Sequence, residues 1–143
     1  MGFDAKRIET LATELLLGIG EDPTREGLKE TPRRMAGMYQ EILSGIDKDP
    51  IQVLGTQFEV SHGGMVLLRD IPFFSVCEHH LLPFFGVTHI GYIPQSKIVG
   101  ISKLARGLDI IAKRLQIQER LTDQLADAIM EAVNPVAVAI VVE

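Results

Sequence analysis

Two stripes of apolar residues at helical spacing occupy the first part of the chain. Asp4 is the expected N-cap of the first helix, and Gly20 is expected to end it. Thr31 and Pro32 are typical of a second helix start, in which a hydroxyl caps the helix and proline takes the first helical position. The stripes consist of Ile8, Leu11, Ala12, Leu15, Leu16 and Ile19, and of Met35, Met38, Tyr39, Ile42 and Leu43. Both are interpreted as packing surfaces, which predicts an N-terminal helical region over residues 1–46.

Strand patterns appear in the rest of the chain. Residues 65–71 and 87–93 predict two strands, and Pro72 is expected to interrupt the first of them. The last segment, residues 136–143, is nearly all β-branched or alanine, which predicts a buried strand.

Two further helices are predicted between these strands. Residues 102–115 show helical spacing with Ser102 as the cap, and residues 121–133 show it up to a stop at Asn134 and Pro135. The predicted order of elements is helix, helix, strand, strand, helix, helix, strand.

Composition and charge argue against several classes of protein. The chain has 143 residues, of which 46% are hydrophobic and 23% charged, as in an ordinary globular protein. It has no apolar run of membrane-spanning length and no secretory signal at its start. A single cysteine agrees with a reducing cytoplasm, and a net charge of −5 argues against nucleic-acid binding. We expect a cytoplasmic protein with neither membrane nor nucleic acid as its partner.

The only cysteine lies in the run Ser75-Val-Cys-Glu-His-His-Leu-Leu-Pro-Phe84, beside two histidines. Cys77 and His80 have a spacing at which a thiolate and an imidazole can bind one metal ion, and this ligand pair suits zinc. In an extended backbone neighbouring side chains point apart, so His79 is expected to remain free for proton transfer. The alternative is a buried structural cysteine beside two surface histidines.

Basic residues predominate between Lys97 and Arg120, where the sequence has six basic and two acidic residues. On an acidic protein, such a local excess favours a small anionic ligand over a long polyanion. A solvated helix face is the alternative.

Two groups of side chains at predicted helix starts extend the candidate site. Ser102, Lys103 and Arg106 could bind phosphate at a helix N-terminus, although ordinary capping explains them equally well. Gln118 and Glu119 lie between two helices, where a carboxylate could accept two N–H bonds from the edge of guanine. Taken alone, Glu119 is also explained as a surface acid. The other histidines, His62 and His89, are interpreted as lying outside this group.

Together these segments closely resemble GTP cyclohydrolase I. The matching segments are residues 21–28, 31–35, 77–84, 92–94, 102–106 and 116–122, which occur in the family's order. The resemblance implies an α+β T-fold, in which an antiparallel four-stranded sheet carries two helices on one face. It also implies an N-terminal helical extension, a T-fold catalytic domain over residues 47–143, and assembly into a toroidal homodecamer.

The resemblance further implies a reaction and roles for the candidate residues. The family uses zinc to hydrolyse and rearrange GTP to 7,8-dihydroneopterin triphosphate and formate, the first step of tetrahydrofolate and pteridine biosynthesis. Cys77 and His80 are then zinc ligands, and His79 donates a proton to the purine ring. The residues implied to bind the substrate are Gln118 and Glu119 at guanine, and Ser102, Lys103 and Arg106 along the ribose-triphosphate.

One departure from the family pattern separates two functional hypotheses. The family places a second histidine, a third zinc ligand (a cysteine), another phosphate-binding arginine and a fourth strand after the strand that ends here at Glu143. A catalytic zinc ordinarily has three protein ligands. The chain is therefore expected to be an enzyme whose C-terminal segment is missing from the sequence or, alternatively, a non-catalytic nucleotide-binding or scaffold relative. The Cys-x-x-His spacing disfavours a nucleophilic Cys77, and the absence of a paired Cys-x-x-Cys disfavours a nucleoside deaminase.

Overall fold

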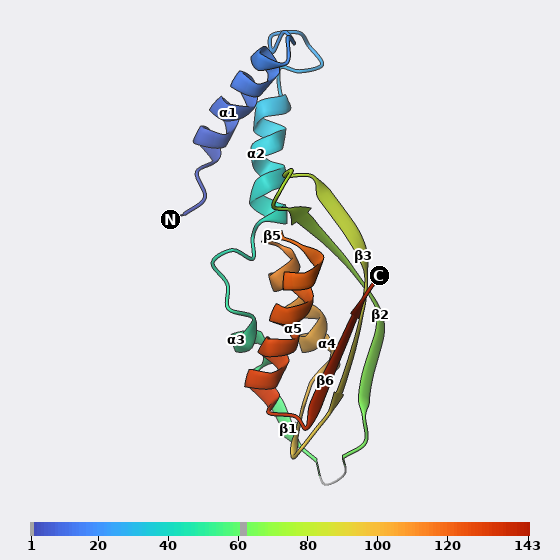
Figure 1. Ribbon diagram of the computed structural model, residues 1–143. Coiled ribbons are helices and arrows are strands. Elements are labelled where there is room, and N and C mark those ends of the chain that lie inside the picture. Colours follow the sequence, from blue (N-terminus) through green and yellow to red (C-terminus); the bar gives the residue numbers. More distant parts are fainter. Residues whose placement is uncertain (1, 61–62) are drawn as a thin grey trace. The chain divides into compact units, whose positions relative to one another are not determined.

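The computed structural model describes residues 2–60 and 63–143 (Figure 1), so His62 lies outside the described residues. The chain divides into two compact units, residues 1–43 and 44–143. Within the described ranges, no helix combines the length and the apolar character that crossing a membrane requires.

The first unit is a pair of packed helices, α1 (Ala5–Gly18) and α2 (Thr31–Ile42). Asp4 caps α1 as predicted, because its carboxylate accepts the backbone N–H of Arg7 at 3.0 Å. The buried residues of the pair are Ala12, Leu16 and Ala36. The periodicity therefore predicted both helices correctly, but their packing faces only in part. The stripe residues that are exposed instead are Leu11, Leu15, Ile19 and Met38.

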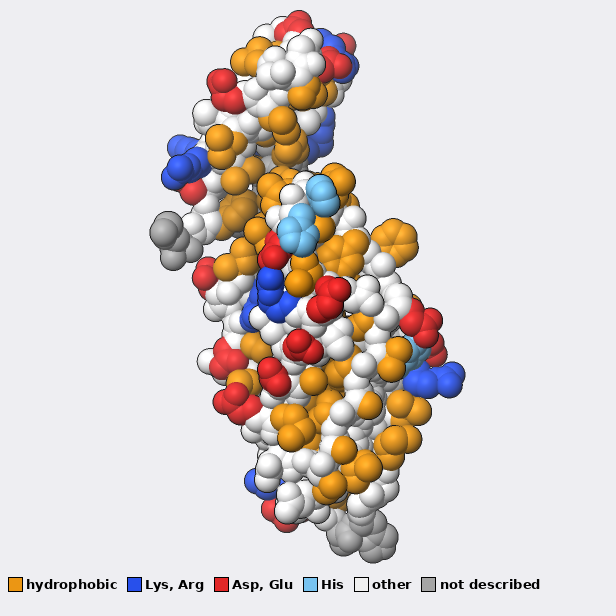
Figure 2. All heavy atoms as spheres, in the orientation of Figure 1, with side chains coloured by type: hydrophobic (Ala, Val, Ile, Leu, Met, Phe, Trp, Pro, Cys, Tyr) orange, Lys and Arg blue, Asp and Glu red, His pale blue; other side chains and the backbone are white. Residues whose placement is uncertain are grey.

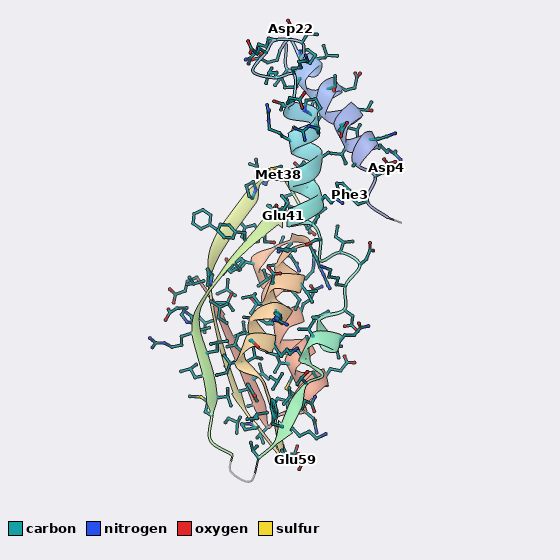
Figure 3. All side chains as sticks on the ribbon, turned by 180° about the vertical axis from the view of Figure 1, so that it is seen from behind. Phe3, Asp4, Asp22, Met38, Glu41 and Glu59 are labelled. Atoms are coloured by element: carbon teal, nitrogen blue, oxygen red, sulfur yellow. The ribbon has the colours of Figure 1, made fainter. Side chains whose placement is uncertain are left out.

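The start of α2 differs from the prediction that Thr31 caps it. Thr31 already belongs to the helix, and the N-cap Glu30 makes no side-chain capping bond. The Thr31 hydroxyl instead accepts a hydrogen bond from the Arg34 side chain one turn on, at 3.0 Å. The order before α2 comes from Asp22, which accepts the N–H and the hydroxyl of Thr24 in the loop between the helices (Figure 3).

Four of the described strands of the second unit form one sheet, in the order β5-β2-β3-β6. β2 (Val66–Cys77) and β3 (Pro83–Ile93) make an antiparallel hairpin, and β6 (Ala137–Val142) is antiparallel to β3. β5 (Leu115–Gln116) runs parallel to the end of β2. The sheet is therefore mixed, whereas a purely antiparallel sheet was expected. The exception is β5, which runs in the same direction as β2.

Two helices cover one face of this sheet, α4 (Ile101–Ala112) and α5 (Gln118–Val133) (Figure 1). A short helix, α3 (Pro50–Leu54), packs on them, and β1 (Gln57–Glu59) pairs with β4 (Lys97–Val99). The most deeply buried core residues are Leu54, Ile90, Tyr92, Leu104, Leu108, Ile111, Leu121, Leu125 and Ile129. The predicted order of the long elements is confirmed, and the short ones are additions to it.

β2 continues through Pro72, which was predicted to interrupt it. Pro72 pairs with Val87 of β3, whereas on the other edge of β2 the described partner β5 reaches only Val76 and Cys77. At Pro72 the strand is thus an edge strand, where a missing N–H removes no bond of the ladder.

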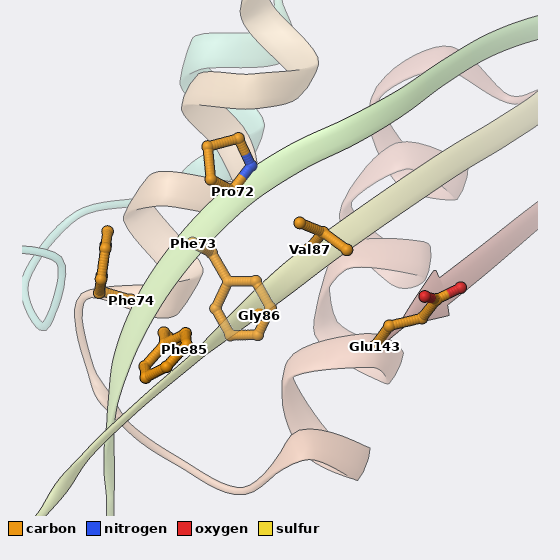
Figure 4. A pocket seen from close by; sticks show the side chains of 7 residues that line it. All are labelled: Pro72, Phe73, Phe74, Phe85, Gly86, Val87 and Glu143. Carbon is orange, nitrogen blue, oxygen red and sulfur yellow. The ribbon is translucent and has the colours of Figure 1, made fainter.

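β6 is half-buried, although its continuous apolar run predicted burial on both sides. Alternate residues of β6 are exposed because the helices cover only one face of the sheet, and Val141 is 52% exposed. Figure 2 shows hydrophobic side chains spread over the uncovered strands. Phe74 and Phe85 line a shallow hollow there with their ring centroids 6.1 Å apart, beside Glu143 (Figure 4).

Candidate functional site

The turn between β2 and β3 carries the predicted metal ligands. β2 ends at Cys77, whose N–H donates to the carbonyl of Leu82 at 2.8 Å and whose carbonyl accepts the N–H of Leu81 at 2.9 Å. Leu81 closes the turn with a φ of 56°, in the left-handed region that non-glycine residues seldom adopt. The side chains of residues 78–81 are consequently held on a tight turn outside the sheet ladder.

The thiol and the two imidazoles of this turn lie close together. Cys77 Sγ is 3.6 Å from Nδ1 of His80 and 4.0 Å from Nδ1 of His79. Zinc–sulfur and zinc–nitrogen bonds of about 2.3 and 2.1 Å at a tetrahedral angle place the two ligand atoms about 3.6 Å apart. Cys77 and His80 therefore fit a zinc ion.

The turn also changes one expectation about the histidines. An extended backbone was expected to point His79 and His80 apart, but these residues form a turn, and an Nδ1 atom of each comes near the sulfur. Both imidazoles are exposed, and their rings are inclined at 76° to each other. Among residues 2–60 and 63–143, no three Cys, His, Asp or Glu side chains form a group that could hold a metal ion.

The backbone of the turn favours the thiolate form of Cys77. The N–H of His79 contributes most to lowering the pKa of the Cys77 thiol below its ordinary value, burial opposes it, and the N–H of His80 assists. A thiolate is the form in which cysteine binds a metal.

An ion pair that the sequence did not predict joins this turn to α5. Arg120 donates from Nη1 to Oε2 of Glu78 at 2.5 Å and from Nη2 to Oε1 at 2.8 Å. This hydrogen bonding is the main reason that the pKa of the Glu78 carboxyl lies below its ordinary value. Glu78 Oε1 also lies 3.9 Å from Nε2 of His79. Figure 2 shows histidine side chains gathered at one place on the surface, with acidic and basic side chains beside them.

Gln118 and Glu119 lie at the same end of the second unit as Cys77. They begin α5, immediately after β5, in which Gln116 pairs with Cys77. Both side chains are exposed, and Gln118 donates to the carbonyl of Val142 at 3.2 Å. Glu119 lies in the first turn of α5, where a carboxylate also interacts favourably with the helix dipole.

Ser102, Lys103 and Arg106 lie in the first half of α4. The N-cap of α4 is Gly100, whereas Ser102 was predicted to be the cap. The helix thus begins two residues earlier than a cap at Ser102 would place it. The Lys103 N–H donates to the Gly100 carbonyl at 2.8 Å. Ser102 and Arg106 are exposed, which leaves them accessible to a ligand.

Within one chain, this phosphate-binding candidate group does not lie at the Cys-His turn. The hydroxyl of Ser75 donates to the carbonyl of Ala112 at 2.7 Å, which places the last residue of α4 beside the end of β2. Ser102 lies in the first turn of the same helix, ten residues earlier, and a rise of about 1.5 Å per residue separates the two positions by about 15 Å. Figure 1 shows α4 starting near β4 and ending near β5.

The basic excess between Lys97 and Arg120 has two explanations in the structure. Arg114 donates to the carbonyls of Gly45 and Lys48, Lys113 pairs with Asp109 at 3.2 Å, and Arg120 pairs with Glu78. The basic side chains without such a partner among the described residues are Lys97, Lys103 and Arg106. Three of the six basic residues are thus bonded within the fold, and the other three could bind an anion.

His89 lies outside the site, as interpreted. Its Nδ1 accepts the backbone N–H of Asp70 at 3.1 Å, and its Nε2 is 3.6 Å from a carboxylate oxygen of Glu143. Asp70 has a φ of 58° at an irregularity in the pairing of β2 with β3. His89 therefore supports the local shape of the sheet.

Comparison with known proteins identifies the family. The model of the family GTP cyclohydrolase I matches residues 8–143. The chain is 57% identical over 143 residues to a GTP cyclohydrolase 1 from Dehalococcoides mccartyi, a match that covers 99% of this chain and 76% of the relative. It is 55% identical over 143 residues to that of Streptomyces coelicolor, covering 99% and 71%, and 55% identical over 142 residues to that of Acetivibrio thermocellus, covering 99% and 76%. The resemblance inferred from the motifs is confirmed, and the chain belongs to the GTP cyclohydrolase I family.

Proposed function

We propose that the turn at residues 77–80 is the reaction centre of a GTP cyclohydrolase I, which hydrolyses GTP to 7,8-dihydroneopterin triphosphate and formate. The observation that carries the assignment of this turn is the 3.6 Å separation of Cys77 Sγ and His80 Nδ1. These two residues hold zinc, and a third protein ligand, which a catalytic zinc ordinarily has, is not among the described residues.

The reaction opens the five-membered ring of guanine at C8. The residues of the turn have two roles in it, metal binding and proton transfer. Zinc, when bound, makes a water molecule acidic enough to supply a nucleophile at neutral pH. His79 delivers a proton to N7, so that this nitrogen can leave carbon. Its imidazole is exposed, and the Glu78 carboxylate 3.9 Å from its Nε2 can orient the ring.

Glu119 and Gln118 bind the guanine. A carboxylate offers two acceptors to the N1–H and the 2-amino group of guanine, and such charge-assisted hydrogen bonds are strong. Support comes from their position at the start of α5, next to the strand that pairs with Cys77. A base held there lies at the same end of the unit as the reaction centre.

Ser102, Lys103 and Arg106 bind the ribose-triphosphate, and the site is completed between copies of the chain. Within one copy these residues begin about 15 Å along α4 from the end that adjoins β2. An assembly of copies brings the phosphate-binding half of one chain to the Cys-His turn of another. Large exposed apolar side chains, among them Phe74 and Phe85, favour burial in such an assembly.

The fold agrees with this assembly. The mixed sheet, the two helices on one face and the N-terminal helix pair are compatible with the T-fold. We infer a toroidal homodecamer of T-fold subunits, as the family resemblance implies. A closed ring also covers the sheet edges and faces that one copy leaves open.

The metal assignment is tested by Cys77→Ala in protein expressed from the complete gene. The parent is expected to hold about one equivalent of zinc per chain, and the variant well below that, because the thiolate is a direct ligand. The measurement is elemental analysis after dialysis. His89→Gln is the control, since it removes an imidazole outside the site and should leave the zinc content unchanged. Parent-like zinc in Cys77→Ala would contradict the assignment.

The shared site is tested by mixing two variants, Cys77→Ala and Arg106→Gln. At GTP concentrations well below KM, each alone is expected to have at most about a tenth of the parent activity, whereas mixed oligomers formed by co-expression should regain about a quarter of it. One site in four then receives both intact halves. The measurement is formate release per site.

Two controls accompany the mixing experiment. Arg106→Gln alone should weaken binding of GTP about tenfold or more and that of guanosine little, because only GTP carries the triphosphate. Lys113→Gln, which removes a paired cation at the C-cap of the same helix, should affect neither ligand. Mixed oligomers as inactive as the single variants would show that both halves of the site come from one chain.

A further inference from the structure

Arg120 and Glu78 form a two-point ion pair between segments that are distant in sequence. Each terminal nitrogen of Arg120 donates to its own oxygen of Glu78, Nη1 to Oε2 at 2.5 Å and Nη2 to Oε1 at 2.8 Å. Such a paired arrangement fixes the direction of approach as well as the distance. The pair joins residues 42 positions apart, whereas Arg25–Glu21 and Lys113–Asp109 join neighbours on one turn through a single contact.

The two partners lie next to residues of the proposed site. Glu78 follows the proposed ligand Cys77 directly and precedes His79, and Arg120 directly follows Glu119. The pair therefore connects the turn that holds the reaction centre with the helix start that holds the base. The Glu78 N–H donates in addition to the Gln116 carbonyl at 3.1 Å, just before that helix start.

Other contacts already hold these segments in the fold. Gln116 is 1% exposed and donates to the carbonyl of Ile111 and to the side chain of Gln124, and Leu121 packs in the core. The side chains of Arg120 and Glu78 are 40% and 30% exposed, and ion pairs at such exposure contribute little to the free energy of unfolding. The pair is thus better suited to orientation than to stability.

The pair also keeps the carboxylate of Glu78 from binding a metal ion. Glu78 is flanked by Cys77 and His79, and a free carboxylate there could compete for a metal ion. Both of its oxygens are instead occupied by Arg120, and Oε1 faces Nε2 of His79 at 3.9 Å.

We propose that Arg120 is a positioning residue, which acts through Glu78 to hold the Cys77–His80 turn in register with Gln118 and Glu119. The base is thereby presented to the reaction centre at the correct place. This inference rests on the proposed function, because it takes the turn as the reaction centre and Glu119 as the base-binding residue.

The first test compares Arg120→Gln with the matched control Asp109→Asn, which removes an ion pair on α4 outside the site. Arg120→Gln is expected to lower kcat for GTP about 10- to 100-fold, because small misplacements of reacting groups cost that much. KM should change little, and zinc content and Tm should stay near those of the parent. Asp109→Asn should leave all four quantities unchanged. An unchanged kcat, or a loss of zinc or a collapse of Tm in Arg120→Gln, would overturn the positioning role.

A double-mutant cycle tests whether Arg120 acts through Glu78. Glu78→Gln, Arg120→Gln and the double variant should all have similar kcat values, because either change breaks the same pair. Arg120→Lys, which keeps the charge and loses the two-point contact, should fall between Arg120→Gln and the parent. Losses that multiply in the double variant would show that the two residues act independently.

A third measurement does not depend on activity. Hydrogen exchange at the backbone amides of Glu78 and Leu81 should become at least about tenfold faster in Arg120→Gln and not in Asp109→Asn, because the turn loses its anchor. Unchanged exchange would refute the anchoring of the turn. If the parent releases no formate from GTP, the proposed function fails, while the exchange result still decides on the anchor.

Discussion

His79→Ala is expected to keep its zinc and its affinity for GTP while formate release falls about 100-fold or more. The imidazole of His79 is exposed on the turn, with its Nε2 3.9 Å from Glu78 Oε1 and its Nδ1 4.0 Å from Cys77 Sγ. It is therefore beside the proposed metal position without being needed to hold the metal. Without it, N7 of guanine receives no proton, and the ring nitrogen is a poor leaving group.

His80→Ala is expected to lose the zinc itself. The 3.6 Å separation of Cys77 Sγ and His80 Nδ1 is the separation that a shared zinc ion requires. Both variants will be inactive, so activity alone does not distinguish the two histidines. Zinc content by elemental analysis and GTP affinity by equilibrium titration do.

The structure makes this contrast a necessary experiment, because both imidazoles lie near the sulfur. If His79→Ala loses zinc and His80→Ala retains it, the ligand and the proton donor are exchanged. If both variants retain zinc and activity, the turn is not the reaction centre. His89→Gln again serves as the control, since its ring is held by Asp70 and lies elsewhere in the sheet.

The long elements of the fold could be predicted from the sequence because each has a pattern of its own. The apolar spacing of α1, α4 and α5 is complete within one segment, and so is the β-branched run of β6. The short strands β1, β4 and β5 contain two or three residues. No periodicity can appear in so few positions, and these strands exist only because a partner elsewhere in the chain completes their hydrogen bonds.

The errors at Pro72 and in β6 have a shared cause. A local pattern states whether a residue suits a strand, but not which edges and faces of that strand are occupied. Pro72 is tolerated because its outer edge has no described partner, and β6 is half-buried because both helices lie on the other face. Tertiary arrangement decides these points.

In the candidate site, too, local features could be predicted from the sequence and features that depend on the tertiary arrangement could not. Cys77 and His80 could be proposed from spacing because their geometry is local to one turn. The Glu78–Arg120 pair could not, because the parallel pairing of β5 with β2 is what brings residues 42 positions apart together. The about 15 Å between Ser102 and the end of α4 likewise follows from the direction of that helix. The sequence contains the Cys-His turn and the phosphate-binding candidates, but it does not show that the two groups lie apart within one chain.

Glu119→Ala is expected to weaken GTP binding by about 2–3 kcal/mol, or about 30- to 150-fold in Kd. The loss is large because two donors of guanine, N1–H and the 2-amino group, are left without their charged acceptor. Equilibrium titration measures it, and the parent should prefer GTP to ATP, since adenine has no N1–H to donate. Asp123→Ala is the matched control, because it removes an exposed carboxylate one turn further along α5 and should bind GTP as the parent does.

Glu119→Gln separates recognition of the base from the general effect of charge near the triphosphate. The amide keeps the size of the side chain but replaces one acceptor with a donor, which then opposes a donor of guanine. We therefore expect Glu119→Gln to lose nearly as much GTP affinity as Glu119→Ala, and to lose its preference for GTP over ATP. Removal of a negative charge by itself should instead strengthen binding of the polyanionic triphosphate. Affinity that rises in Glu119→Gln, or a parent that does not distinguish GTP from ATP, would show that Glu119 acts only through its charge and does not read the base.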